Sequence, residues 1–155
     1  MNWPWSRRKF KDGLRRCDAT DVRATVKRLW PNSNLAIECG DFEYYMPNRM
    51  VSEWLWENVP QILHGYAKSA FDCENFTRKR MVQMDDLLQY WTDLDLPLAV
   101  FEVRGYTQDN RGPDRPGHSM LLELTGDVGS RLREPYAGFT IKDTKYIEEP
   151  WLVYQ

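Results

Sequence analysis

The sequence predicts an α+β fold in which N-terminal helices pack on a mostly antiparallel β-sheet. In the first half of the chain, apolar residues recur at spacings of three and four, which is typical of helices that bury one face. In the second half, short runs of β-branched, aromatic and aliphatic residues are separated by turn residues, as in antiparallel sheets. Helices followed by strands in this way define the α+β class.

Composition fits one ordered domain preceded by a basic arm. The chain has 155 residues, of which 42% are hydrophobic and 28% charged, a balance that excludes wholesale disorder. We expect an arm over residues 1–17 that is irregular and rich in Trp and basic residues, then a single α+β domain over residues 18–155. The basic residues of the arm are Arg7, Arg8, Lys9, Lys11, Arg15 and Arg16.

Charge, hydropathy and cysteine content limit the classes of protein that fit this sequence. The net charge of -2 argues against a nucleic-acid binder, although the arm leaves open an accessory role whose binding would depend on salt. We find no apolar stretch near the ~20 residues that span a bilayer and no signal-peptide pattern, so we expect a cytoplasmic protein. The three Cys match no common zinc spacing, which predicts reduced thiols and neither metal nor cofactor. Oligomeric state is not specified.

Turn and capping residues indicate which elements to expect before residue 70. We expect a helix over 21–30 with Asp18 or Thr20 as its N-cap, and then strands over 35–39 and 42–45 that are separated by a bend or hairpin. Helical segments follow over 50–66 and are divided at Pro60.

The clearest helix in the sequence starts at Cys73. Residues at alternating spacings of four and three share one face with this thiol and predict a buried stripe: Thr77, Met81, Met84, Leu88 and Trp91. Strands are then expected over 98–104, 118–124, 130–134 and 146–153. Residues 107–117 form a Gly- and Pro-rich loop before His118, either a wall of a site or a plain connection.

Cys73 and His118 are the candidates for a nucleophile and its base. A helix N-terminus and a nearby imidazole commonly lower the pKa of a catalytic cysteine, and Cys73 meets the first condition by position. His118 opens a strand, whereas His64, the other histidine, is expected at a solvent-facing helix end. The alternative is that Cys73 has only a structural role, as a small apolar residue at the start of a core helix.

A hairpin connects His118 to Glu134. If residues 125–129 form the turn with Gly126 near its centre, Leu122 lies opposite Ser130 and His118 lies opposite Glu134. Directly opposed side chains are close enough for a carboxylate to orient an imidazole. The pattern therefore predicts a triad of Cys73, His118 and Glu134.

Three short motifs carry a family resemblance. They are Phe71-Asp72-Cys73-Glu74-Asn75-Phe76, Pro116-Gly117-His118-Ser119 and Arg133-Glu134-Pro135-Tyr136. Over residues 44–139 the chain resembles the transglutaminase-like and papain-like cysteine hydrolase superfamily, and in particular small phage and bacterial proteins with Asp-Cys, Gly-His and Glu-Pro motifs in this order. The resemblance implies Cys73 as nucleophile, His118 as base and Glu134 as orienting acid. Tyr136 stands where many such proteins have Gln.

Two functions follow as expectations. The first is a cysteine hydrolase or acyltransferase acting on an amide, isopeptide or thioester, such as a peptide, protein or peptidoglycan-type substrate, with Trp54, Tyr106 and Tyr136 as substrate-binding aromatics. The second is an inactive binding module with the same fold, for example a phage protein that binds a host protein.

Overall fold

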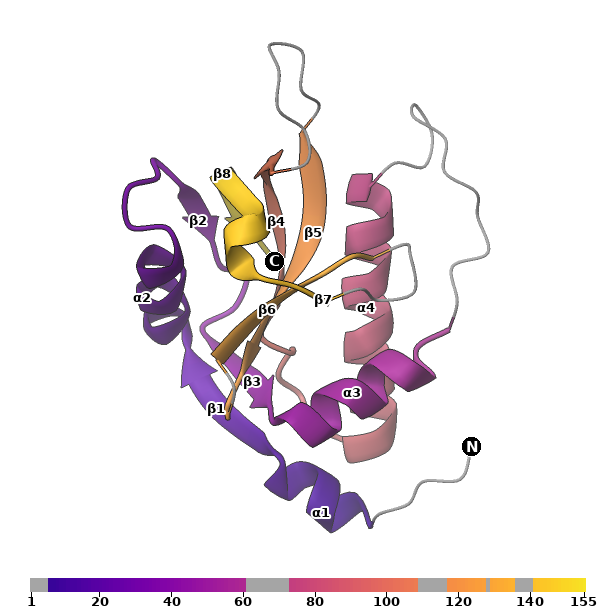
Figure 1. Ribbon diagram of the computed structural model, residues 1–155. Coiled ribbons are helices and arrows are strands. Elements are labelled where there is room, and N and C mark those ends of the chain that lie inside the picture. The colour runs from indigo at the N-terminus through magenta and orange to yellow at the C-terminus, as the bar shows by residue number, and fades with distance from the viewer. Residues whose placement is uncertain (1–5, 61–72, 109–116, 128, 136–140) are drawn as a thin grey trace.

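A six-stranded sheet forms the centre of the fold, and helices cover it (Figure 1). The structure is a computed structural model that describes residues 6–60, 73–108, 117–127, 129–135 and 141–155. Its helices are α1 (Arg7–Asp12), α2 (Ala19–Leu29), α3 (Arg49–Asn58), α4 (Cys73–Thr92) and the 3-10 helix η1 (Thr144–Tyr146). Its strands are β1 (Leu14–Asp18), β2 (Ala36–Glu38), β3 (Glu43–Pro47), β4 (Val100–Thr107), β5 (His118–Thr125), β6 (Gly129–Arg133), β7 (Ile141–Lys142) and β8 (Ile147–Tyr154).

The α+β class is confirmed, with a mixed sheet. The strand order is β2-β8-β4-β5-β6-β7. The pairs from β8 to β7 are antiparallel, and β2 joins β8 as a parallel edge strand. Strands β1 and β3 form a separate antiparallel pair, and the bridge between Tyr45 and Leu98 connects this pair to the start of β4.

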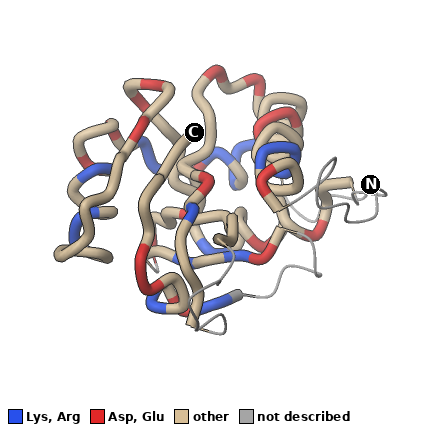
Figure 2. The backbone as a smooth tube through the Cα atoms, turned by 90° about the horizontal axis from the view of Figure 1, so that it is seen from above, with Lys and Arg blue, Asp and Glu red and all other residues tan. Residues whose placement is uncertain are grey.

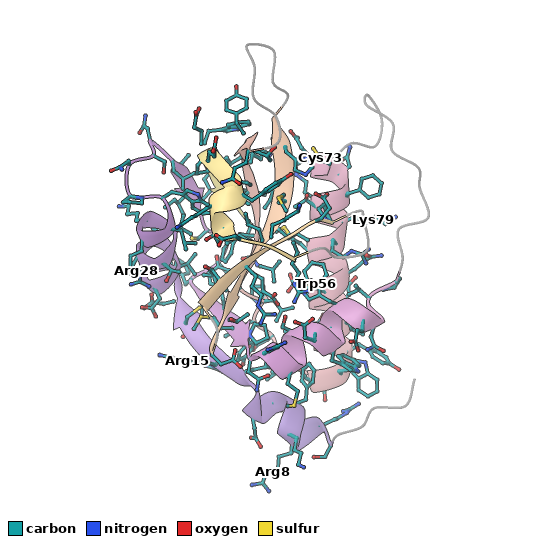
Figure 3. All side chains as sticks on the ribbon, viewed as in Figure 1. Arg8, Arg15, Arg28, Trp56, Cys73 and Lys79 are labelled. Carbon is teal, nitrogen blue, oxygen red and sulfur yellow. The ribbon has the colours of Figure 1, made fainter. Side chains whose placement is uncertain are left out.

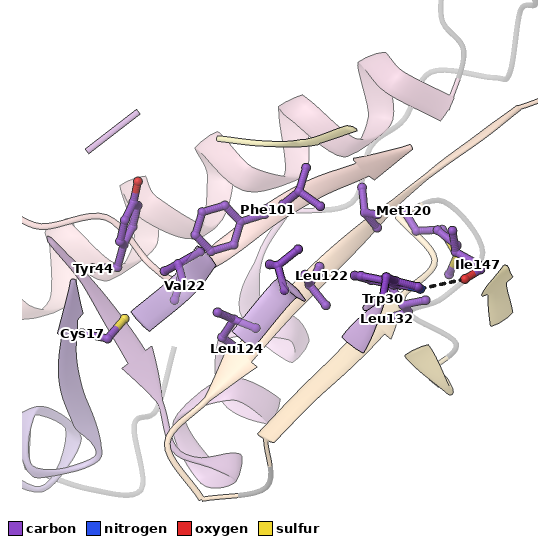
Figure 4. Packing of buried hydrophobic residues seen from close by; sticks show 14 of the residues in the cluster. Cys17, Val22, Trp30, Tyr44, Phe101, Met120, Leu122, Leu124, Leu132 and Ile147 are labelled. Carbon is purple, nitrogen blue, oxygen red and sulfur yellow. Dashed lines mark hydrogen bonds between the residues drawn. The ribbon is translucent and has the colours of Figure 1, made fainter. Parts of the chain in front are cut away.

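The sheet is buried on both faces. On one face, Phe101 and Met120 pack with Val22 of α2, as Figure 4 shows. On the other face, Val100 and Leu121 pack with residues of α1, α3 and α4. The physical reason is visible in the strands, because β4 and β5 carry apolar residues at both odd and even positions, which supplies an apolar surface to each face.

The N-terminal segment is more regular than predicted. From Arg7 onward it forms α1 and β1, so the expectation of an irregular arm over these residues is wrong. Phe10 is 2% exposed and belongs to the core, and Arg16 and Cys17 pair with β3. Four of the six residues of α1 are basic, and this masked the pattern, because Phe10 is the single apolar residue of the helix. Figure 2 shows that basic and acidic residues are both spread over the described chain.

The structure tests three local predictions: a helix cap, a hairpin and a divided helix. Asp18 caps α2 by accepting a hydrogen bond from the Asp21 backbone at 2.8 Å, which confirms one of the two predicted caps. Residues 35–45 bend but do not form a hairpin, since β2 pairs with β8 and β3 with β1. Helix α3 ends before Pro60, and the helical continuation expected beyond Pro60 lies outside the described residues.

The close approach of β8 to β4 depends on Gly105. A Cβ atom placed there would lie 2.9 Å from both the Glu149 oxygen and the Pro150 Cα atom, and would overlap Ile147. Gly105→Ala is therefore expected to lower the free energy of unfolding by about 1–3 kcal/mol, as overpacked cores do. Urea unfolding measures this. Gly126→Ala is the control, because its added methyl group would meet its nearest atom at 3.6 Å, and an equal loss in both variants would contradict the explanation.

Candidate active site

Cys73, His118 and Glu134 come from three elements that meet at one end of the sheet. Cys73 is the first residue of α4, His118 is the first residue of β5, and Glu134 directly follows β6. Figure 3 marks Cys73 at the end of α4 that lies beside the start of β5. Helix α4 packs along β4 and β5, with Met84 and Leu88 fully buried, and this packing fixes the position of the thiol.

The imidazole of His118 bonds to the carboxylate of Glu134. The distance from Nε2 of His118 to Oε2 of Glu134 is 2.9 Å, and the two side chains are 27% and 20% exposed. A short, half-buried contact of this kind holds the ring in one orientation and leaves Nδ1 for another partner. The expected pairing of these two residues is thus present.

The register that produces this pairing is not the predicted one. Leu122 lies opposite Leu132, and Ser130 lies opposite Leu124, so β6 is displaced by two residues from the expected alignment. The turn centres on Asp127 instead of Gly126. Because side chains alternate with a period of two, an even displacement keeps His118 and Glu134 on one face as diagonal neighbours. Their long side chains span the diagonal.

The thiol of Cys73 lies close enough to the His118 ring to affect its pKa. Burial of the ring opposes its protonation, but interaction with the Cys73 thiol, the hydrogen bond that the protonated ring donates to Glu134 and the negative charge of Glu134 outweigh it. Together they raise the pKa of His118 from 6.5 to about 9. With a pKa of about 9, the His118 ring carries a proton at neutral pH.

The raised pKa of His118 predicts a pH-dependent stability. The folded-state value lies above the unfolded one, so the stabilisation is complete below pH 6.5 and is lost as the pH rises through about 9. Relative to His118→Gln, the wild-type protein should lose up to ~3 kcal/mol of unfolding free energy across this window. Urea unfolding at pH 6 and pH 9.5 measures the difference. A difference between the two proteins that is constant or grows with pH would contradict the assignment.

A buried polar network lies beneath the thiol. Thr77 donates to the Cys73 carbonyl oxygen at 2.7 Å, and Ser119 lies 3.0 Å from the Thr77 hydroxyl. Ser119 also donates to Glu102, which is fully buried, at 2.8 Å. These contacts tie the first turn of α4 to β4 and β5.

Two arginines compensate the charge of Glu102. Arg104 contacts Glu102 at 2.7 Å and Glu74 at 3.0 Å, and Arg78 contacts Glu102 at 3.2 Å. Glu74 directly follows Cys73, so Arg104 also connects the helix start to the sheet. Sequence reasoning missed this network. The signal was an acidic residue inside an apolar strand, since a buried carboxylate needs partners of this kind.

The expected substrate-binding aromatics have different environments. Trp54 is 7% exposed and packs edge-to-face between Phe10 and Trp91, so the expectation that it binds substrate is wrong. Its helical spacing in α3 belongs to the core. Tyr106 is partly exposed next to Gly105, the residue opposite His118. Tyr136 and His64 lie outside the described residues.

The other two cysteines have environments that disfavour a thiolate. Burial, with the nearby Asp21 and Asp18, raises the pKa of Cys17 to about 11. Burial likewise raises the pKa of Cys39. Within the described residues, no three His, Cys, Asp or Glu side chains gather as a metal site, and no described helix is long and apolar enough to cross a bilayer.

Comparison with known proteins identifies the fold alone. Neither a family model nor a curated protein matches the sequence. The solved structure of the PSL1a-E64 complex is similar over 90% of this chain, with a TM-score of 0.74 and 12% identity. The Polyporus squamosus lectin bound to the human-type influenza-binding epitope Neu5Aca2-6Galb1-4GlcNAc matches 90% of this chain, with a TM-score of 0.70 and 12% identity. This chain spans about half of each structure, 51% and 49% of their lengths.

Proposed function

We propose that the protein is a cysteine hydrolase or acyltransferase of the papain-like or transglutaminase-like type. The observation that carries the proposal is that His118 bonds to Glu134 at 2.9 Å while the Cys73 thiol lies close enough to the same ring to raise its pKa. The position of Cys73 at the start of α4 adds support, because helix geometry leaves the first amides without intrahelical acceptors and directs them at a developing oxyanion.

The proposed reaction begins with attack of the Cys73 thiolate on the carbonyl carbon of an amide. A C–S bond forms, and the oxyanion lies at the N-terminus of α4. The His118 imidazolium gives its proton to the leaving nitrogen as the C–N bond breaks, which produces a thioester and a free amine. Water then loses a proton to His118 and attacks the thioester, and the carboxylic acid leaves as the thiolate and imidazolium return. An amine in place of water gives acyl transfer.

In this proposal Glu134 and the buried network position the reacting groups. Glu134 orients the ring and stabilises its charged form. Thr77 and Ser119 hold the first turn of α4. The substrate belongs to the peptide, protein or peptidoglycan-type amides, and the free thiols are those of a protein in the reducing cytoplasm.

Cleavage of an unbiased peptide mixture tests the proposal. The purified protein is incubated with peptides of mixed sequence, and new termini are identified by mass spectrometry. We expect new termini with the wild-type protein and with Cys39→Ala, and none with Cys73→Ala. Identical mixtures from the wild type and Cys73→Ala would support the alternative, an inactive binding module with this fold.

A further inference from the structure

Two carboxylates outside the predicted triad lie close to Cys73. Glu74 is the next residue of α4, and Glu102 of β4 is fully buried below the first turn of this helix. Two hydroxyl groups connect Glu102 to Cys73. Ser119 donates to Glu102 at 2.8 Å and lies 3.0 Å from the hydroxyl of Thr77, which donates to the Cys73 carbonyl oxygen at 2.7 Å. Negative charge near a thiol opposes its ionisation, so a Cys73 that reacts as a thiolate needs these two charges to be compensated.

Arg104 contacts both carboxylates at once. Its Nε atom lies 2.7 Å from Oε1 of Glu102, and its Nη1 atom lies 3.0 Å from Oε2 of Glu74. The side chain is 18% exposed, so water screens these ion pairs only in part. In the sheet, Arg104 lies opposite Ser119, directly beside the pair formed by Gly105 and His118. The strand register therefore places this cation next to both the helix start and the imidazole.

The charge of Arg104 also interacts with Cys73. Burial of Arg104 opposes its protonation, but the hydrogen bond to Glu102 and the negative charges of Glu102, Glu74 and Cys73 outweigh burial and raise the pKa of Arg104. Coupling between two sites is reciprocal, so a guanidinium that is favoured by negative charge on Cys73 favours that charge in return. The contacts of Arg104 with the two carboxylates and its interaction with the thiol thus belong to one charge cluster.

Arg78 is a second cation on Glu102, but its position is more open. Its Nε atom lies 3.2 Å from Oε2 of Glu102, and its side chain is 54% exposed. Solvent and salt screen exposed charges, which leaves Arg104 as the better-shielded cation of the two.

We propose that Arg104 is a positioning residue that neutralises Glu74 and Glu102 and thereby allows Cys73 to react as a thiolate. The inference rests on the proposed function, because that function requires the thiolate. It adds a cation from β4 to the predicted triad. Arg104 acts through the two carboxylates and takes no part in making or breaking bonds to the substrate.

The rate of iodoacetamide alkylation at Cys73 tests this role. The rate is measured at pH 7 by mass spectrometry in the wild-type chain, in Arg104→Gln and in the matched control Arg131→Gln. Arg131 is 13% exposed and bonds to the partly exposed Glu53 at 2.7 Å, so it matches the pair of Arg104 with Glu74. We expect alkylation to be about tenfold slower in Arg104→Gln, the low end of what a neighbouring opposite charge contributes to ionisation. Arg131→Gln should keep the wild-type rate.

Removal of Glu102 separates charge compensation from packing. Glu102→Gln keeps the cation, so Cys73 should be alkylated about threefold faster than in the wild type, and Glu102→Gln/Arg104→Gln should return to within about twofold of the wild-type rate. A purely structural role of Arg104 predicts a slow double variant instead. The double variant contains no unpaired charge at position 102 and should fold even if Arg104→Gln does not. Circular dichroism checks that each protein is folded.

The outcomes distinguish this role from the proposed function. If Cys73 is alkylated at equal rates in the wild type and in folded Arg104→Gln, or in Glu102→Gln and the double variant, the role of Arg104 is refuted. A double variant as slow as Arg104→Gln refutes it as well. In these cases the hydrolase proposal stands, provided that Cys73 of the wild type reacts faster than Cys17 and Cys39. If Cys73 is no more reactive than those two thiols, both proposals are refuted.

Discussion

His118→Ala is expected to lower the rate of amide cleavage by about 10²- to 10⁴-fold, the usual contribution of a positioned acid or base. The ring bonds to Cys73 and Glu134, so its removal takes away the imidazolium that stabilises the thiolate and protonates the leaving nitrogen. Cleavage of a peptide found in the mixture experiment measures the effect. Cys39→Ala, whose thiol lies outside the site, should keep the wild-type rate.

Glu134→Gln provides the companion measurement. The amide keeps a hydrogen-bonding side chain of similar size but removes the charge that helps raise the pKa of His118 to about 9. The alkaline limb of the pH–rate profile should therefore shift to lower pH, which loss of packing alone would not cause. A profile identical to that of the wild type would exclude an electrostatic role for Glu134.

Arg133→Met is expected to destabilise the fold by about 3–5 kcal/mol, because it leaves a buried carboxylate without its cation. Arg133 is 2% exposed and contacts the fully buried Glu123 at 3.0 Å. Its guanidinium also lies 4.8 Å from the ring centroid of Trp56 and donates to Ser52 of α3. It therefore joins α3 to β5 and β6, directly before Glu134.

A double-mutant cycle separates the ion pair from general packing. Arg133→Met combined with Glu123→Leu removes both charges, so the double variant should recover most of the loss caused by Arg133→Met alone. Arg131→Met is the control, because its partner Glu53 is 37% exposed and such pairs contribute about 1 kcal/mol or less. Additive losses in the double variant would exclude the buried pair as the cause. Urea unfolding supplies each value.

The elements that were predicted correctly are those that one clear local pattern marks in the sequence. Helix α4 covers Cys73–Thr92 and buries Thr77, Met84 and Leu88 of the predicted stripe, and the starts of β5 and α2 follow from a loop and a capping residue. The pairing of His118 with Glu134 was predicted from a register displaced by two residues. It is present because an even displacement preserves the face of each side chain.

The remaining features depend on contacts between distant segments. The pairing of β2 with β8 and of β1 with β3 joins residues that no local pattern connects. From the sequence, Trp54 fits both a core residue and an exposed aromatic that binds substrate. Its edge-to-face contact with Phe10 shows that it belongs to the core. The two bulges in β8 become visible only in its pairing with β4.

The pH dependence of iodoacetamide alkylation, followed at each cysteine in the wild type and in His118→Ala, tests the central claim most directly. We predict that Cys73 is alkylated faster than Cys17 and Cys39 at neutral pH, because burial raises the pKa of Cys17 and Cys39. This reactivity should be lost in His118→Ala. A Cys73 that is inert, or that reacts equally with and without His118, would contradict the account.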